Sequence, residues 1–252
     1  MLLEVREISK SFGWLKAVDK CHMVVQENSI TGLIGPNGAG KSTVFSLITG
    51  FLKPDKGEII YQGTNITELP PYAIARKGLG RTFQTPQGLP RMTVLENLLL
   101  AGSTEAEERI LSILFSGRKI REREKAYKAE ALELLNAMGF IDKKNEYIAN
   151  LSPGEARVVE VLRQLMLKPK LLCLDEPASG LNLASQRELE KFIRKLLERG
   201  LTMLIVEHNL NFIMRLSSTL YVMNRGGIIA HGVPDEVAKD DKVIEVYLGG
   251  RP

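Results

Sequence analysis

The chain has 252 residues, of which 44% are hydrophobic and 25% charged, the composition of a globular protein with a sizeable core. Its formal charge of +4 is too small an excess for a dedicated nucleic-acid-binding protein. Two cysteines, Cys21 and Cys173, exclude a disulfide framework, and neither has the spacing of a metal ligand. No apolar stretch reaches the length of about 20 residues that a membrane helix needs, and the first residues lack the apolar segment of a signal peptide. We therefore expect a cytoplasmic α/β protein that binds no nucleic acid.

Short apolar segments predict β-strands in the first quarter of the chain. A glycine-rich turn over 35–40 precedes a predicted helix over 41–49, and a Pro/Gly turn lies over 53–57. The predicted strands are one around Leu3, Val5 and Ile8, followed by strands over 23–25, 30–34 and 58–61.

Helical periodicity dominates the middle of the chain, and strand signals return after it. The predicted helices cover 94–101, 106–114 and 119–138, the last ending at Gly139. The later strands cover 171–174, 203–206 and 220–223. Alternating strands and helices predict a mostly parallel sheet. We expect one domain over 1–252, with a catalytic core over about 1–93 and 168–252 and a helical subdomain over 94–167.

Residues 35–42 read Gly-Pro-Asn-Gly-Ala-Gly-Lys-Ser and fit the pattern GxxxxGK[ST] between an apolar strand and a helix. Glycines let the backbone curl so that its N–H groups point at phosphate oxygens, and the helix N-terminus adds a positive dipole. Lys41 is suited to the β- and γ-phosphates, and Ser42 to Mg²⁺. The predicted nucleotide contacts are Gly35, Pro36, Asn37, Gly38, Ala39, Gly40, Lys41, Ser42 and Thr43.

Four apolar residues, 171–174, lead into the carboxylates Asp175 and Glu176. Ligands of open α/β sheets bind at the carboxyl ends of the strands. Asp175 is therefore predicted to bind Mg²⁺ through water, and Glu176 to orient or deprotonate the water that attacks the γ-phosphate. Two solvated acids at a strand end are the alternative, which the phosphate loop upstream disfavours.

Further motifs follow in a fixed order: Phe12 in Ser-Phe-Gly, Gln84 in Arg-Thr-Phe-Gln, Leu-Ser-Pro-Gly-Glu at 151–155, Ser-Gly-Leu-Asn at 179–182, and Glu-His at 207–208. This set resembles the ATP-binding-cassette (ABC) ATPases over essentially the whole chain. The resemblance implies a P-loop NTPase core with an antiparallel N-terminal β part and an inserted all-helical lobe.

The resemblance also implies roles for individual residues. Gln84 is the Q-loop residue, which contacts Mg²⁺ and the attacking water, and His208 senses the γ-phosphate. Phe12 matches the aromatic position that stacks on adenine, although a lone Phe after a strand is often a core residue. Ser152 and Gly154 of the signature 151–155 contact the ATP of a second ATPase subunit, so that hydrolysis needs a homo- or heterodimer.

A narrower resemblance is to the ATP-binding subunits of branched-chain amino-acid importers, carried by 32–42, 80–84, 92–97 and 176–182. It implies integral membrane permease partners that meet the helical lobe and residues 84–93, an indirect link to a substrate-binding protein, and a peripheral location at the inner face of the cell membrane. A urea importer, a lipopolysaccharide exporter and a soluble ATPase of the iron–sulfur assembly type remain as alternatives.

The signature departs from the common Leu-Ser-Gly-Gly-Gln at Pro153 and Glu155. Pro153 suits the first position of a helix, and Ser152 with Glu155 fits a capping box. A carboxylate near a bound polyphosphate should weaken that contact unless Glu155 turns back to cap Ser152. We therefore expect a working but attenuated signature.

Overall fold

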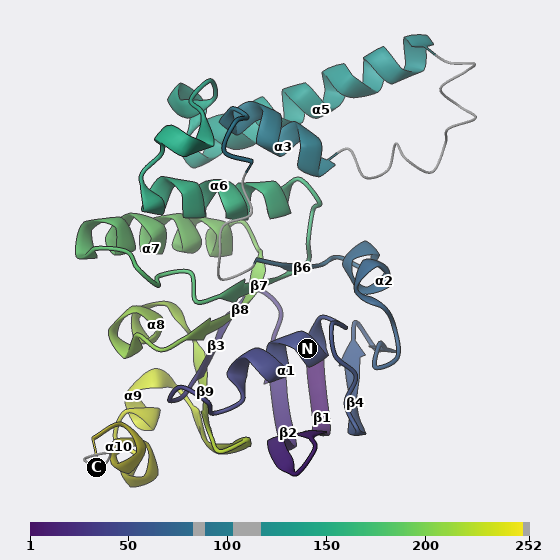
Figure 1. Ribbon diagram of the computed structural model, residues 1–252. Helices are drawn as coiled ribbons and strands as arrows, with labels where there is room; N and C mark the ends of the chain where they lie inside the picture. The colour runs from purple at the N-terminus through teal and green to yellow at the C-terminus, as the bar shows by residue number, and fades with distance from the viewer. Residues whose placement is uncertain (83–88, 103–116, 249–252) are drawn as a thin grey trace. The chain divides into compact units, whose positions relative to one another are not determined.

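The computed structural model describes residues 1–82, 89–102 and 117–248 (Figure 1). The chain divides into two compact units. Unit 1 consists of Met1–Gln84, Pro169–Ser179 and Ile193–Pro252, and unit 2 of Thr85–Lys168 and Gly180–Phe192. Among the described residues, no helix combines the length and the apolar character needed to cross a membrane.

Unit 1 begins with a four-stranded antiparallel sheet of order β2-β1-β4-β5. Its strands are β1 (Leu3–Phe12), β2 (Leu15–Val25), β4 (Lys56–Tyr61) and β5 (Thr64–Asn65). Leu3, Val5 and Ile8 of β1 are fully buried. A register shift between Val5 and Ile8 explains why the inward positions step by three residues there instead of two.

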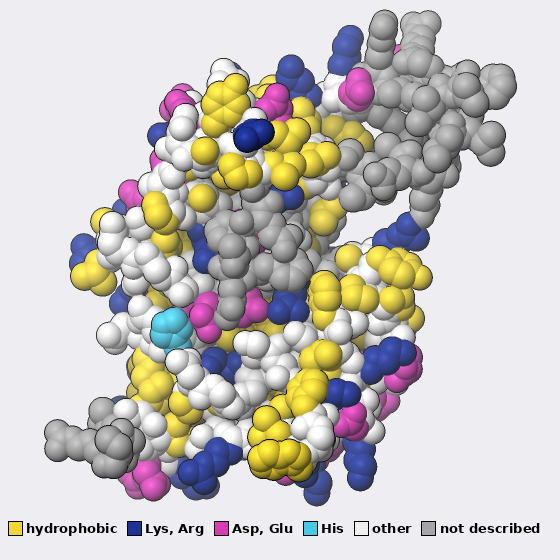
Figure 2. All heavy atoms as spheres, viewed as in Figure 1, with side chains coloured by type: hydrophobic (Ala, Val, Ile, Leu, Met, Phe, Trp, Pro, Cys, Tyr) yellow, Lys and Arg dark blue, Asp and Glu magenta, His cyan; other side chains and the backbone are white. Residues whose placement is uncertain are grey.

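The turn between β1 and β2 carries exposed hydrophobic side chains. Trp14 is 99% exposed and Leu15 61% exposed. Figure 2 shows hydrophobic side chains gathered over the turn that connects the strands labelled β1 and β2 in Figure 1.

The second sheet of unit 1 has six strands in the order β10-β9-β3-β8-β7-β6. All neighbours pair in parallel except β9 and β10. The strands are β3 (Ile30–Ile34), β6 (Leu79–Arg81), β7 (Leu171–Asp175), β8 (Thr202–Glu207), β9 (Thr219–Asn224) and β10 (Gly227–Gly232). Every residue of β3, β7 and β8 is buried, because parallel strands are covered on both faces.

Helix α1 (Lys41–Ile48) lies within the core of unit 1, with Val44 and Phe45 fully buried. They belong to one cluster with side chains of the antiparallel sheet, such as Met23, and of the parallel sheet, such as Val206. This packing fixes the start of α1 and therefore the turn 35–40 before it. The other helices of unit 1 are α2 (Pro71–Arg76), α8 (Leu210–Leu216), α9 (Pro234–Val237) and α10 (Asp241–Leu248).

Unit 2 is helical in its described part. It contains α3 (Val94–Gly102), α5 (Gly117–Met138), two 3₁₀ turns (Ile141–Lys143 and Ile148–Asn150), α6 (Pro153–Leu165) and the first part of α7 (Leu183–Glu198). Asn97 of α3 is fully buried. Its Nδ2 donates to Thr93 O at 2.9 Å, and its Oδ1 accepts from Leu89 N at 2.9 Å, so the buried amide is satisfied and anchors the start of α3.

The strand predicted over 30–34 is confirmed residue for residue, and the helix predicted over 119–138 begins two residues earlier, at Gly117. The helix predicted over 106–114 lies outside the described residues. The α/β fold class with a mostly parallel sheet is confirmed.

Candidate functional site

The turn between β3 and α1 is built from glycines in left-handed backbone conformations. Gly38 has φ 78° and Gly40 φ 105°, values that an L side chain rarely adopts. A Cβ atom on Gly40 would also lie 2.3 Å from Ala17 O. Gly40 is the N-cap of α1 and has no side chain to satisfy the first N–H groups of the helix, which are therefore available to an anion.

Lys41, the first residue of α1, is buried, and its ammonium group folds back over this turn. Its Nζ donates to Gly35 O at 2.7 Å and to Pro36 O at 2.9 Å. Burial lowers the pKa of Lys41, and the negative charges of Glu176, Asp175 and Glu207 oppose that shift. Lys41 Nζ is thus held at the turn by two backbone carbonyl groups, and three acidic side chains act on it electrostatically.

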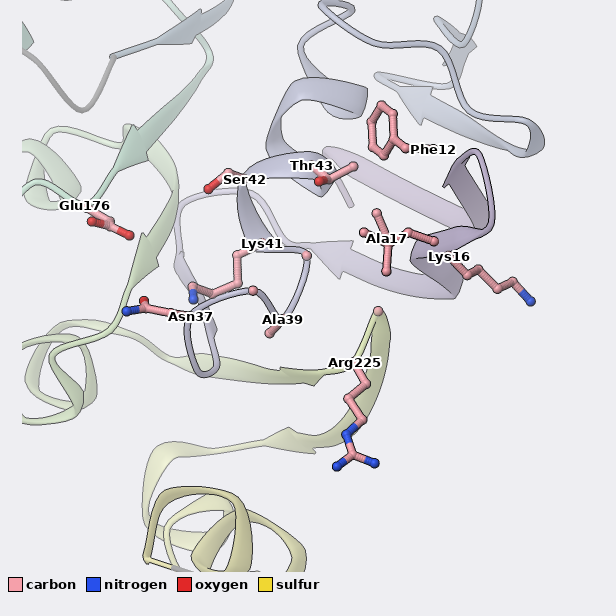
Figure 3. A pocket seen from close by; sticks show the side chains of 14 residues that line it. Phe12, Lys16, Ala17, Asn37, Ala39, Lys41, Ser42, Thr43, Glu176 and Arg225 are labelled. Atoms are coloured by element: carbon pink, nitrogen blue, oxygen red, sulfur yellow. The ribbon is translucent and has the colours of Figure 1, made fainter. Parts of the chain in front are cut away.

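A cavity of about 590 Å³ opens over the turn (Figure 3), within the size range of small-molecule and cofactor sites. Phe12 and Ala17 lie at one end of it and Glu176 lies at the other, beyond Lys41. The lining residues are Phe12, Leu15, Lys16, Ala17, Asn37, Gly38, Ala39, Gly40, Lys41, Ser42, Thr43, Glu176, Arg225 and Gly226. An aromatic end and a turn of backbone N–H groups with a lysine suit a nucleotide.

Asp175 is the last residue of β7 and is only 3% exposed. Its Oδ2 accepts a hydrogen bond from Arg81 Nη2 at 3.0 Å, and its backbone N donates to Thr82 Oγ1 at 3.3 Å. Its Oδ1 is buried, and no described residue donates a hydrogen bond to it.

Glu176 and His208 follow the ends of neighbouring parallel strands, β7 and β8. The Glu176 backbone is left-handed, with φ 46°, and its N–H donates to Val206 O at 2.9 Å. Glu176 Oε2 lies 3.7 Å from His208 Nδ1. The structure therefore brings together two side chains that lie far apart in the sequence.

The signature lies in unit 2, at the start of α6. Ser152 Oγ accepts from Glu155 N at 3.3 Å, and Glu155 Oε2 accepts from Ser152 N at 2.8 Å, so the predicted capping box is confirmed. Glu155 Oε1 also pairs with Lys143 Nζ at 3.2 Å. Although burial acts to raise the pKa of Glu155, the hydrogen bonds from Ser152 and Lys143 lower it. A side chain on Gly154 would meet Ser185, because its Cβ would lie 2.9 Å from the Ser185 Cβ.

Two sets of residues complete the comparison with the sequence-based site. Gln84 lies outside the described residues. Sequence reasoning missed Leu15–Ala17, Arg225 and Gly226 of the cavity lining. The segment 15–17 could have been predicted as part of the site, because it follows Phe12 closely in the sequence. Arg225 and Gly226 form the tight turn between β9 and β10, which has no motif of its own.

Comparisons with known proteins decide the family. The model of the ABC transporter family matches residues 18–179, more than half of the chain. The chain belongs to this family. A second model, described as "Branched-chain amino acid ATP-binding cassette transporter", matches residues 228–251 of the cassette.

The cassette is similar to whole proteins and to a solved structure. It is 39% identical over 251 residues to the probable branched-chain amino acid transport ATP-binding protein LivG of Archaeoglobus fulgidus, covering 99% of this chain and 96% of the relative. The corresponding protein of Methanocaldococcus jannaschii is 38% identical, with 98% and 97% covered. The ADP conformation of MJ1267, an ATP-binding cassette of an ABC transporter, superposes with a TM-score of 0.86 at 37% identity and covers 98% of both chains. The cassette is thus an ATPase that binds ATP, and its hydrolysis serves transport.

The donor set of the site fits Mg²⁺, the usual companion of ATP. Asp175 Oδ1 is a carboxylate oxygen that no described residue occupies, and the Ser42 side chain is exposed in the first turn of α1. Mg²⁺ prefers such oxygens and is bound by one or two protein groups together with substrate phosphates and water. The residues present are therefore compatible with the ion.

Proposed function

We propose that this cassette is the ATP-hydrolysing subunit of an importer of branched-chain amino acids. The match of residues 228–251 to the model of branched-chain amino-acid cassettes carries this proposal. Relatives that this chain covers over 96–97% of their own length are named as ATP-binding proteins of that transport system. Their similarity over the full length favours this substrate class over urea or lipopolysaccharide transport and over a soluble iron–sulfur assembly ATPase.

The nucleotide is held along the cavity of unit 1. Phe12 stacks on adenine with the ring face away from Lys10, whose Nζ lies 5.9 Å from the ring centroid. The residues that bind the phosphates are those of the turn and the start of α1, Gly35, Pro36, Asn37, Gly38, Ala39, Gly40, Lys41, Ser42 and Thr43. Lys41 exchanges its bonds to Gly35 O and Pro36 O for the β- and γ-phosphates. That exchange returns hydrogen bonds to a buried cation, so little is lost by breaking the contacts with the loop.

Ser42, Asp175 and Gln84 would hold Mg²⁺, which when bound neutralises charge that develops on the phosphate oxygens. Arg81 keeps Asp175 Oδ2 engaged, so Oδ1 is the oxygen available to the ion or its waters. Because Oδ1 is itself buried, the atoms that cover it would have to move before it could act as a ligand.

Glu176 acts as the general base. Its carboxylate takes a proton from water as the water oxygen bonds to the γ-phosphorus. The bond between that phosphorus and the β–γ bridging oxygen breaks, leaving ADP and phosphate. His208, 3.7 Å from Glu176 Oε2, contacts the γ-phosphate and reports its presence.

The complete site also requires a second ATPase subunit, which presents Ser152 and Gly154 to the γ-phosphate. Both lie at the N-terminus of α6, where the helix dipole favours an anion. Permease subunits carry the solute across the membrane, a binding protein delivers it, and the cassette lies peripherally on the cytoplasmic face.

Purification of the tagged chain from membranes of its own organism tests this proposal. We expect permease subunits to co-purify, and the complex, reconstituted in liposomes with its binding protein, to accumulate radiolabelled leucine only with ATP. The Glu176→Gln complex is the matched control and should bind leucine-loaded binding protein without transport. Accumulation of urea instead of leucine, or recovery of the chain without any membrane protein, would contradict the proposal.

A further inference from the structure

Glu207 is a buried carboxylate that the proposed mechanism does not use. It is the last residue of β8 and is fully buried. Burying a carboxylate is costly unless hydrogen bonds or charges compensate it. Burial accordingly raises the pKa of Glu207, and N–H groups of the backbone and the charge of His208 oppose the shift.

Three backbone N–H groups from two different loops donate to this carboxylate. Oε1 accepts from Ala178 N at 2.7 Å. Oε2 accepts from His208 N at 3.2 Å and from Asn209 N at 3.4 Å. Each oxygen therefore serves a different loop, one after β7 and one after β8.

These two loops carry the groups nearest to the proposed chemistry. Ala178 follows Glu176 by two residues, and His208 is the next residue after Glu207. A second bond ties the loop after β7 to strand β8 itself, because Glu176 N donates to Val206 O at 2.9 Å. Glu176 Oε2 and His208 Nδ1, which lie 3.7 Å apart, are thus carried by two segments whose backbones both donate to the Glu207 carboxylate.

We propose that Glu207 is a positioning residue for ATP hydrolysis, whose carboxylate holds the Glu176 loop and the His208 loop at a fixed separation by accepting N–H groups from both. This role rests on the proposed function of Glu176 and His208. Glu207 itself is fully buried, and both of its carboxylate oxygens already accept backbone N–H groups, so it acts through the two loops and not on the nucleotide.

The geometry requires a carboxylate at this position. A glutamine of the same length has one acceptor end and one donor end. Whichever way the amide is turned, its NH₂ group faces at least one of the three N–H groups. One loop therefore loses its anchor, and a buried N–H group is left unsatisfied.

The test compares Glu207→Gln with Ile205→Val in the complete 252-residue chain. Ile205 is a fully buried residue of the same strand, so Ile205→Val removes one buried methyl group and lowers Tm without touching either loop. We expect Glu207→Gln to lower kcat by about tenfold to a hundredfold, the range that small misplacements of reacting groups produce. The ADP dissociation constant, measured by calorimetry, should change by less than about twofold, because the turn 35–40 is unaltered.

A second readout needs no turnover. Amide hydrogen exchange of peptides covering 176–182 and 207–210 should accelerate in nucleotide-free Glu207→Gln, whereas α1 and β3 keep wild-type exchange. Ile205→Val should keep kcat within about twofold of wild type, even if its Tm is as low as that of Glu207→Gln or lower. If Glu207→Gln does not fold, Glu207→Asp, which keeps the charge but shortens the side chain, takes its place.

Three results would overturn the positioning role. Glu207→Gln could retain wild-type kcat and local exchange, Ile205→Val could lose as much kcat at the same Tm, or ADP affinity could fall as far as kcat. Wild-type turnover is measured first, because a wild-type chain without ATP hydrolysis contradicts the proposed function itself. An active wild type beside an equally active Glu207→Gln contradicts only the role of Glu207.

Discussion

Arg81 Nη2 lies 3.0 Å from Asp175 Oδ2, and the two side chains are only 12% and 4% exposed. The guanidinium also donates from Nη1 to Thr49 Oγ1 at 2.9 Å and lies 5.7 Å from the ring centroid of Phe45. One carboxylate oxygen of Asp175 is thereby bound from within unit 1, and the other is left to a ligand. The Arg81 pair thus orients the carboxylate at the end of β7.

Replacing Arg81 by methionine should destabilise the chain by about 3–5 kcal/mol, because it leaves the buried Asp175 carboxylate without its cation. Urea denaturation of Arg81→Met, Asp175→Asn and the double variant measures this. We expect the double variant to be more stable than the sum of the single losses predicts, since neither charge is then left alone. Additive losses would show that the two side chains are energetically independent.

Replacing Glu176 by glutamine should reduce ATP turnover at least about a hundredfold, the usual contribution of a general base. The glutamine side chain is isosteric but cannot take a proton from water, so ATP should still bind with unchanged affinity. Phosphate release measures turnover, and size-exclusion chromatography with ATP should show accumulation of the dimer. Persistent turnover would place the base on another residue.

The strands that hold the site could be predicted because parallel strands buried on both faces are continuous apolar runs. Leu171–Asp175 begins with four apolar residues, and Ile30–Ile34 is apolar except for Thr31 and Gly32; both stand next to a motif with fixed spacing. By contrast, β6 is only Leu79–Arg81 with a central glycine, and β10 is partly exposed throughout. Neither has a periodicity that separates it from a loop.

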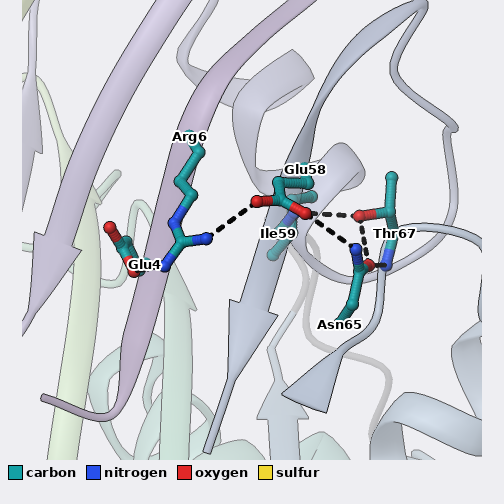
Figure 4. Close-up of polar contacts among 6 residues, drawn as sticks. All are labelled: Glu4, Arg6, Glu58, Ile59, Asn65 and Thr67. Atoms are coloured by element: carbon teal, nitrogen blue, oxygen red, sulfur yellow. Dashed lines mark hydrogen bonds and ion pairs between the residues drawn. The ribbon is translucent and has the colours of Figure 1, made fainter. Parts of the chain in front are cut away.

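Pairing partners that are distant in sequence were also beyond sequence reasoning. Arg6 Nη1 binds Glu58 Oε1 at 2.8 Å across β1 and β4, and Asn65 Nδ2 binds Glu58 Oε2 at 3.0 Å (Figure 4). The register Arg6↔Glu58 brings these charges together, but many other acid–base pairs in the chain would have served. The bond from Ala178 N to Glu207 was hidden for the same reason, because a backbone donor has no sequence signal.

Glu155 shows a case in which local rules were sufficient. The sequence predicts that Glu155 weakens the signature unless it turns back to cap Ser152. The structure shows this capping box, and Lys143 also pairs with the Glu155 carboxylate. We now predict that Glu155→Gln gives no gain in turnover, since glutamine can also cap Ser152. Stability should fall by less than about 1 kcal/mol, the range of a partly exposed ion pair. An increase in turnover would instead support the hypothesis from the sequence that Glu155 attenuates the signature.

The same residue gives a pH dependence with a defined sign. The hydrogen bonds from Ser152 and Lys143 leave the pKa of Glu155 lowered in the folded state, although burial opposes them. Its stabilisation is therefore fully present above the ordinary glutamate pKa and is lost as the pH falls through the lowered value. The difference in Tm between wild type and Glu155→Gln should shrink as the solution is acidified below about pH 4.3, the usual glutamate pKa. A difference that is constant with pH would assign the effect to packing.

Phe12 and Trp14 offer a matched pair of aromatic residues on one turn. Phe12 lines the cavity, whereas Trp14 is 99% exposed and is absent from the lining. Phe12→Ala should weaken ATP binding about tenfold to a hundredfold, since stacking of a base on an aromatic side chain contributes about 1–3 kcal/mol. Trp14→Ala should leave the affinity within about twofold of wild type, because the side chain makes no contact with the site.

Calorimetric titration of both variants with ATP and with free triphosphate separates the contribution of the adenine end of the nucleotide from that of the phosphate end. Triphosphate should bind wild type and Phe12→Ala equally well, because it has no base to stack. Equal losses of ATP affinity in both variants would show that the turn as a whole, and not the Phe12 ring, determines binding.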